Sequence, residues 1–170
     1  MGLVAVMAAV AVPQFLAGVD RSRAWAAARY LAGRMHAARA HAVLRSAHVA
    51  LRFVDDRSGI SFQTFVDDNQ NGVRSTDIAA AIDRPLDAPT RMSELFSGVD
   101  IAIDPDLGSD PIRIGPSNLL SFTPLGTSTS GTVHIRGRDG TQLAVRVLGA
   151  TARARVLRYD PRTRDWVESF

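Results

Sequence analysis

Oxygen-bearing side chains at alternate positions form the sharpest chemical motif in the chain. Asp67, Asn69, Asn71 and Gly72 match the D-x-[DN]-x-[DN]-G opening of a calcium-binding loop. In such a loop the alternate side chains converge on one cation, and the glycine permits the sharp turn. The twelfth position, where a bidentate acid belongs, holds an isoleucine, and Asp77 precedes it. Calcium is therefore a candidate cofactor with Asp67, Asn69, Asn71 and Asp77 as ligands, and a turn held by local hydrogen bonds is the alternative.

Arginines gather near the C-terminus. Arg153 and Arg155 alternate along an expected strand and so point to one face, with Arg146 on the strand before and Arg158 beyond. Guanidinium groups on one face suit phosphate, which predicts salt-sensitive binding to nucleic acid. The alternative is that these arginines pair with acidic loops or solvate a sheet edge.

No catalytic constellation emerges from the sequence. Residues 126–131 lack the G-x-S-x-G spacing, and no P-loop or dinucleotide glycine pattern occurs. The four histidines form no i, i+4 pair, and the absence of cysteine excludes a thiolate nucleophile, a thiolate zinc site and a disulfide. We therefore expect a protein that is not an enzyme, with no cofactor other than the candidate calcium.

Charge is segregated along the chain, and every basic side chain apart from histidine is an arginine. Residues 1–54 carry seven Arg against one acid, giving +6, and residues 55–110 carry four Arg against twelve acids, giving −8. Residues 111–170 carry nine Arg against four acids, giving +5. This pattern indicates an acidic loop region between two basic elements. The two basic elements are expected to face each other, a polyanion or only solvent.

The elements that position these groups begin with an apolar helix. Residues 3–16 are apolar except Gln14, and no charge occurs before Asp20. The run resembles a membrane segment but is shorter than the roughly twenty residues that a span needs. Pro13 within it predicts a kink or one loosened turn. The residues expected in a membrane or filament core are Leu3, Val4, Val6, Val10, Val12 and Pro13.

An amphipathic helix is expected over residues 20–47, because small and apolar residues recur there at spacings of three and four. It continues the apolar run, so one helix of more than forty residues results. Its small residues would let a sheet approach closely. We therefore divide the chain into an anchor half, residues 1–19, and a globular domain, residues 20–170, with its β-rich part at residues 48–170.

After His48 the periodicity changes to two, which predicts strands. A hairpin is expected over residues 49–66 with its turn at 55–59, followed by mostly loop at 67–110 with a short helix near 78–82 and a strand at 99–103. Further strands are expected at residues 112–114, 119–122, 132–136, 142–148, 153–159 and 166–168. A helix followed by strands predicts an α+β fold with antiparallel sheet.

Three segments resemble the type IV pilin-like superfamily, and within it the GspH/FimT family of minor pilins and H-type pseudopilins. They are LVAVMAAVAVP at residues 3–13, AAARYLAGRMHAARAHAVLR at 26–45 and FTPLGTSTSG at 122–131. The resemblance implies a pilin-like fold, with a long N-terminal helix packed on an antiparallel β-rich head. Family members also carry a leader peptide and a cleavage site before the helix, so we expect the chain to lack about ten mature residues that would complete a span.

The resemblance implies a structural subunit of a type II secretion pseudopilus or a type IV pilus, acting in filament initiation or at the tip. Its expected partners are other pilin or pseudopilin subunits and the bacterial inner membrane, which it crosses once, with the head in the periplasm or outside the cell. FimT-like members that take up DNA carry a G-R-x-R motif, and residues 152–155 are similar with alanine in place of glycine. A DNA receptor for natural transformation is therefore the alternative function.

Overall fold

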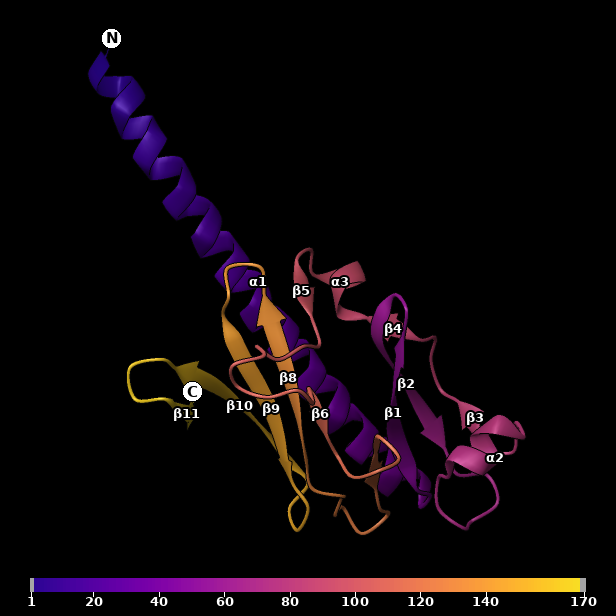
Figure 1. The fold of residues 1–170 in the computed structure, drawn as a ribbon. Helices are drawn as coiled ribbons and strands as arrows, with labels where there is room; N and C mark the ends of the chain where they lie inside the picture. The colour runs from indigo at the N-terminus through magenta and orange to yellow at the C-terminus, as the bar shows by residue number, and fades with distance from the viewer. Residues whose placement is uncertain (1, 169–170) are drawn as a thin grey trace.

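The computed structural model describes residues 2–168, with side chains from residue 17, and joins one long helix to two sheets (Figure 1). The helices are α1 (Gly2–Arg45), α2 (Ser75–Ala79) and α3 (Met92–Leu95). The strands are β1 (Val49–Asp56), β2 (Gly59–Val66), β3 (Arg84–Pro85), β4 (Thr90–Arg91), β5 (Val99–Asp100), β6 (Ile112–Arg113), β7 (Leu119–Phe122), β8 (Gly131–Gly137), β9 (Gln142–Leu148), β10 (Arg153–Asp160) and β11 (Asp165–Glu168).

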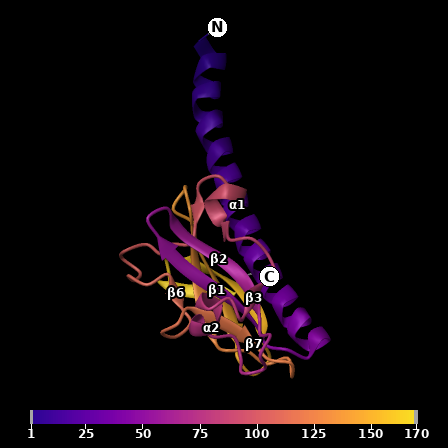
Figure 2. The same ribbon diagram turned by 90° about the vertical axis from the view of Figure 1, so that its right-hand side faces the viewer.

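The C-terminal half of α1 packs along both sheets, and its N-terminal half projects beyond them (Figures 1 and 2). One stripe of small and apolar side chains makes this contact, as the spacing of three and four predicts. Because most of its members are alanines, the strands approach the helix closely. The buried residues of the stripe are Ala24, Ala27, Ala28, Leu31, Met35, Ala38 and Ala42.

A Schellman motif ends α1 two residues before the predicted boundary. The N–H of Ala47 donates to the carbonyl of Ala42 (3.2 Å), and the N–H of Ser46 donates to that of Val43 (3.3 Å). Ser46 takes the left-handed conformation (φ 51°) that glycine usually supplies at this position. The expected end at residue 47 was wrong because the sequence carries no glycine there to mark the stop.

Sheet A has the strand order β3-β2-β1-β7, with β4 also pairing β2. The predicted hairpin is confirmed: β1 and β2 pair from Val49↔Val66 to Asp56↔Gly59. β7 pairs the other side of β1, in the register Val49↔Phe122. Sheet B has the order β11-β10-β9-β8-β5, with β6 also pairing β8. All of these pairings are antiparallel, which confirms the predicted fold class.

The main core lies between α1 and the inner faces of both sheets. Its largest fully buried side chains include Phe62 and Phe122 from sheet A and Ile135 and Leu143 from sheet B. A second, smaller cluster consists of Ala50, Phe65, Val73 and Leu119, and its β1 member, Ala50, lies between Val49 and Leu51 of the main core. Sheet A is thus covered over part of both faces.

The part of the acidic region that was predicted to be mostly loop, residues 67–110, contains more structure than expected. The short helix predicted at 78–82 lies instead at Ser75–Ala79, because Ala81 turns to a positive φ of 56° and stops it. The strand predicted at 99–103 is reduced to Val99–Asp100. The short elements β3, β4 and α3 were not predicted, since two to four residues give no measurable periodicity.

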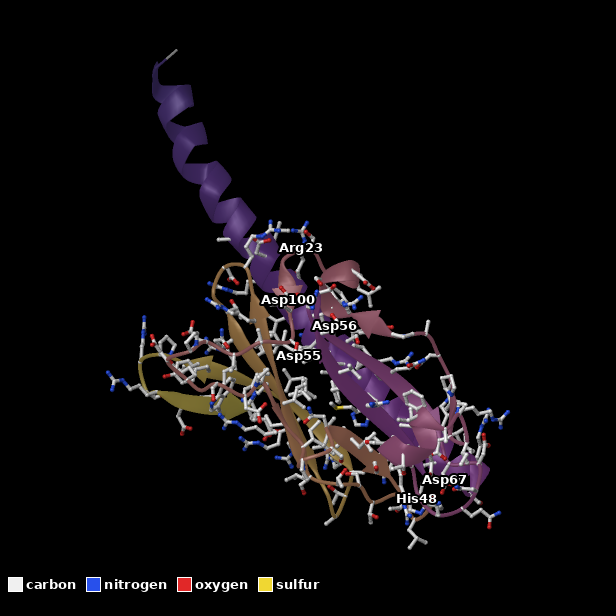
Figure 3. All side chains as sticks on the ribbon, turned by 45° about the vertical axis from the view of Figure 1, so that its right-hand side comes forward. Arg23, His48, Asp55, Asp56, Asp67 and Asp100 are labelled. Atoms are coloured by element: carbon white, nitrogen blue, oxygen red, sulfur yellow. The ribbon has the colours of Figure 1, made fainter. Side chains whose placement is uncertain are left out.

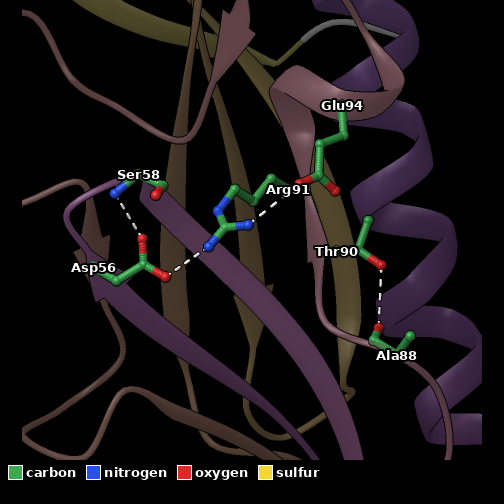
Figure 4. Close-up of polar contacts among 6 residues, drawn as sticks. All are labelled: Asp56, Ser58, Ala88, Thr90, Arg91 and Glu94. Atoms are coloured by element: carbon green, nitrogen blue, oxygen red, sulfur yellow. Dashed lines mark hydrogen bonds and ion pairs between the residues drawn. The ribbon is translucent and has the colours of Figure 1, made fainter.

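Arginines tie this acidic region to the rest of the head. Arg91 contacts Asp56 at the hairpin tip (2.6 Å) and Glu94 in α3 (3.2 Å), as Figure 4 shows. The N–H of Ser58 and the guanidinium of Arg91 hold the pKa of the Asp56 carboxyl below its usual range. Arg34 on α1 pairs with Asp87, which also accepts the backbone N–H of Thr64 (2.8 Å).

Candidate functional site

The projecting half of α1 is the first candidate functional element. The backbone is helical from Gly2 and continues through Pro13 as one element. The sequence-predicted filament residues Leu3, Val4, Val6, Val10, Val12 and Pro13 lie on this half, where the structure describes no side chains. Within the described side chains, burial of α1 begins at Ala24. No helix within residues 2–168 combines the length and hydropathy of a membrane span.

The C-terminal arginines divide into two places. Arg146 and Arg155 are direct partners across β9 and β10, and Arg153 lies two residues from Arg155 on the same strand. Arg153 and Arg155 line a hollow together with Trp25 and Arg29 of α1. Arg158 instead lines a separate cleft that also contains Asp104, Asp106 and Asp139. The structure therefore brings three of the four predicted arginines together and separates the fourth.

The arginine hollow already contains its own counter-charge. Glu168 lines it and pairs with Arg155 at 2.8 Å. The guanidinium of Arg29 lies 5.9 Å from the ring centroid of Trp25, within range of a cation–π contact. Sequence reasoning missed Trp25 and Arg29, because only the docking of α1 against sheet B places them beside β10.

The predicted calcium residues come together just after the end of β2. There the backbone N–H of Asp67 donates to the carbonyl of His48 (2.9 Å). Figure 3 shows Asp67 and His48 near one another, with Asp55 and Asp56 at the other end of the hairpin. The carboxylate of Asp77 accepts hydrogen bonds from the side-chain N–H groups of both Asn71 and Asn69. These bonds lower the pKa of the Asp77 carboxyl below its usual range.

The described part of the chain holds no dense cluster of metal-ligating side chains. No three His, Cys, Asp or Glu side chains there lie close enough together to hold a metal ion. His134 is buried, and its Nδ1 lies 3.1 Å from the Pro111 carbonyl oxygen. Burial lowers the pKa of His134, and a neutral ring packed edge-on against Trp166 fits a structural role.

Comparison with known proteins agrees with this architecture. A family model described as type II transport protein GspH matches residues 27–152, from within α1 to the turn before β10. Arg153, Arg155 and Arg158 lie beyond the matched segment.

Among solved structures, the fold is similar to that of the minor pseudopilin EpsH from the Type 2 Secretion System of Vibrio cholerae. The TM-score is 0.56 at 14% sequence identity, and the match covers 80% of this chain and 97% of that one. A search of the curated proteins by sequence finds no match. Because the family model spans more than half of the 170 residues, the chain belongs to the type II transport protein GspH family.

Proposed function

We propose that this protein is a minor pseudopilin, a non-catalytic structural subunit of the type II secretion pseudopilus. In this role it assembles with other pseudopilin subunits and acts at filament initiation or at the tip. Before assembly, the apolar half of α1 holds the subunit in the bacterial inner membrane, with the head on the periplasmic side.

The observation that carries the proposal is the projection of α1 from the head, in a chain that belongs to the GspH family (Figure 1). Residues 3–16 are apolar except Gln14, so water is an unfavourable environment for this half of the helix. Lipid or the helices of neighbouring subunits would cover it, and a helix that is apolar all round can exchange one for the other. The described core of the head takes its α1 side chains from Ala24 to Ala42.

A DNA-uptake function is not proposed, since neither the family model nor the structural match supports it. Three of the four arginines that suggested it, Arg153, Arg155 and Arg158, lie outside the matched segment, and Arg155 is paired with Glu168. Alanine replaces the glycine of the motif that suggested the function.

Deletion of the gene in its host tests the proposed function. We expect export through type II secretion to be lost, and to be restored by the wild-type gene, while pilus-dependent motility is unchanged. Lost motility with intact secretion would contradict the proposal.

Cysteine crosslinking tests assembly directly, because the chain has no native cysteine. Val10→Cys is expected to crosslink to a cysteine in the N-terminal helix of another pseudopilin only in cells in which the pseudopilus is assembled. Ser109→Cys, in an exposed loop of the head, is the control and should not crosslink to that helix. Equal crosslinking from both positions would indicate random collision.

A further inference from the structure

The Asp67 loop, residues 67–74, begins at a buried carboxylate. Asp67 is 4% exposed, and its oxygens accept the backbone N–H groups of Asn69 (3.2 Å) and Gly72 (2.7 Å). Gly72 has a positive φ of 85°, which permits the sharp turn. The chain therefore wraps around the Asp67 carboxylate, as it does around the first ligand of a calcium loop.

A second acidic side chain lies against this loop and is incompletely satisfied. Asp83 is 1% exposed, and its Oδ2 accepts the N–H of Arg74, the last residue of the loop (3.0 Å). Its Oδ1 is buried without a hydrogen-bond partner. A buried carboxylate oxygen that is left unpaired is costly, and a bound cation would satisfy it. Asp83 was missed in the sequence because it lies sixteen residues after Asp67.

Asp77 orients the two amides of the loop. Its Oδ2 accepts the side-chain N–H groups of Asn69 (3.2 Å) and Asn71 (3.0 Å). Because the nitrogen and oxygen of an amide point in different directions, both carbonyl oxygens are turned away from Asp77. The oxygen of Asn69 accepts the backbone N–H of Asn71 (3.4 Å) and keeps a second lone pair for a ligand. Metal ligands are commonly oriented in this way, by hydrogen bonds to groups that do not themselves contact the metal.

The loop is anchored to sheet A by apolar packing. Val73 is buried with Phe65, Ala50 and Leu119 in the second apolar cluster, and Ile78 of α2 packs against the same cluster. The entry from β2 and the exit into α2 are thereby fixed relative to sheet A. A preorganised loop loses less conformational entropy when it binds an ion.

We propose that this loop binds a calcium ion, with Asp67, Asn69, Asn71, the Val73 carbonyl and Asp83 as ligands. This set contains only oxygen donors, which calcium prefers, and Asp77 acts as the orienting group in place of a ligand. With two carboxylates, the site resembles weak extracellular modules, whose dissociation constants are roughly 10⁻⁴ to 10⁻³ M. The inference does not depend on the secretion role.

Calcium titration of the full chain, after removal of metal with chelator, tests the proposal. Calorimetry is expected to show one site in this affinity range, with magnesium bound more weakly. At about 10 mM calcium the thermal midpoint should rise by about 3 °C or more, since the ion binds only the folded state.

Three variants locate the site. Asp83→Asn keeps the shape and an acceptor for Arg74 but removes the charge, and it should weaken calcium binding about tenfold or more. Asp55→Asn makes the same charge change at the opposite end of the hairpin and should bind calcium like the wild type. Because Asp83 is buried and its variant can fail to fold, Asn69→Ala with Asn71→Ala offers a second test at two exposed positions.

Two results would overturn the proposal. One is the absence of a calcium-specific heat or midpoint shift in the wild type up to about 10 mM. The other is calcium binding that survives unchanged in the Asn69→Ala, Asn71→Ala variant, which would place the ion elsewhere.

Discussion

Ser46 shows how a single residue ends the long helix. It is exposed and adopts a left-handed conformation (φ 51°) at the position after Arg45. A residue with a Cβ atom pays roughly 1–2 kcal/mol to adopt the left-handed conformation. Glycine avoids this cost, but its greater conformational freedom in the unfolded state offsets part of the gain.

We therefore expect Ser46→Gly to increase the free energy of unfolding by about 0.5–1 kcal/mol, measured by denaturant titration. Ser109→Gly is the control, because Ser109 is also exposed but does not have a positive φ. It should leave stability unchanged or lower it slightly. A gain of the same size in both variants would point to a general effect of glycine.

His134 is expected to make the stability of the head sensitive to acid. Its pKa in the folded state is lowered, chiefly by burial, while the unfolded state titrates near the usual 6.5. The unfolded state therefore binds more protons as the pH falls below 6.5. The contribution of the neutral ring is present above pH 6.5 and is lost as the pH falls toward the folded-state pKa.

We expect the free energy of unfolding to fall less between pH 7.5 and about 5 in His134→Gln than in the wild type. Denaturant titrations at both pH values measure this difference. Whatever Gln costs in packing enters at both pH values and cancels. Parallel pH dependence in the two proteins would show that other groups dominate.

At the scale of elements, the crossing of α1 and β8 depends on two small residues. A Cβ placed on Gly137 would lie 3.1 Å from the Cβ of Ala24 and 2.8 Å from an oxygen of Asp139. The helix and the strand can pack at this distance only because both positions are small. The alanine stripe of α1 thus needs a matching glycine on the sheet.

Gly137→Ala should destabilise the protein by about 1–3 kcal/mol, because the helix or strand must move to admit the methyl group. Gly33 lies on an open face of α1, where an added Cβ would meet no atom within 4 Å apart from its own helix. Gly33→Ala should therefore stabilise the protein by about 0.5–1 kcal/mol. Denaturant titration measures both. Since both variants make the same chemical change, an equal effect would contradict the close crossing.

At the scale of the whole molecule, the chain combines a head with its own core and a helix that extends beyond it. Burial of the described side chains of α1 begins at Ala24, and the N-terminal half projects away from both sheets (Figure 2). We propose that the two parts are separable in stability, although one helix joins them.

A variant that lacks residues 1–16 is expected to unfold with a denaturant midpoint close to that of the full chain. The reason is that the stripe from Ala24 to Ala42, which forms the core, is retained. The full chain, kept in mild detergent, is the control. A large fall in the midpoint would show that the apolar half contributes to the head.

Local patterns in the sequence were sufficient to predict much of this fold. The alanine spacing predicted the buried stripe of α1, and the alternation after His48 predicted the β1–β2 hairpin. The boundaries of β7 and β9 agree with the predictions because turn residues flank both strands. The resemblance in three segments predicted the family that the comparison confirmed.

Other features depended on contacts between residues distant in the sequence, which no local pattern encodes. Only the tertiary structure placed Trp25 and Arg29 beside Arg153 and separated Arg158 from the other arginines. Only the tertiary structure singled out Asp83 among twelve central acids, through its buried carboxylate oxygen that has no hydrogen-bond partner. Periodicity thus determined which residues face the core, and the packing of helix against sheets decided which polar groups meet.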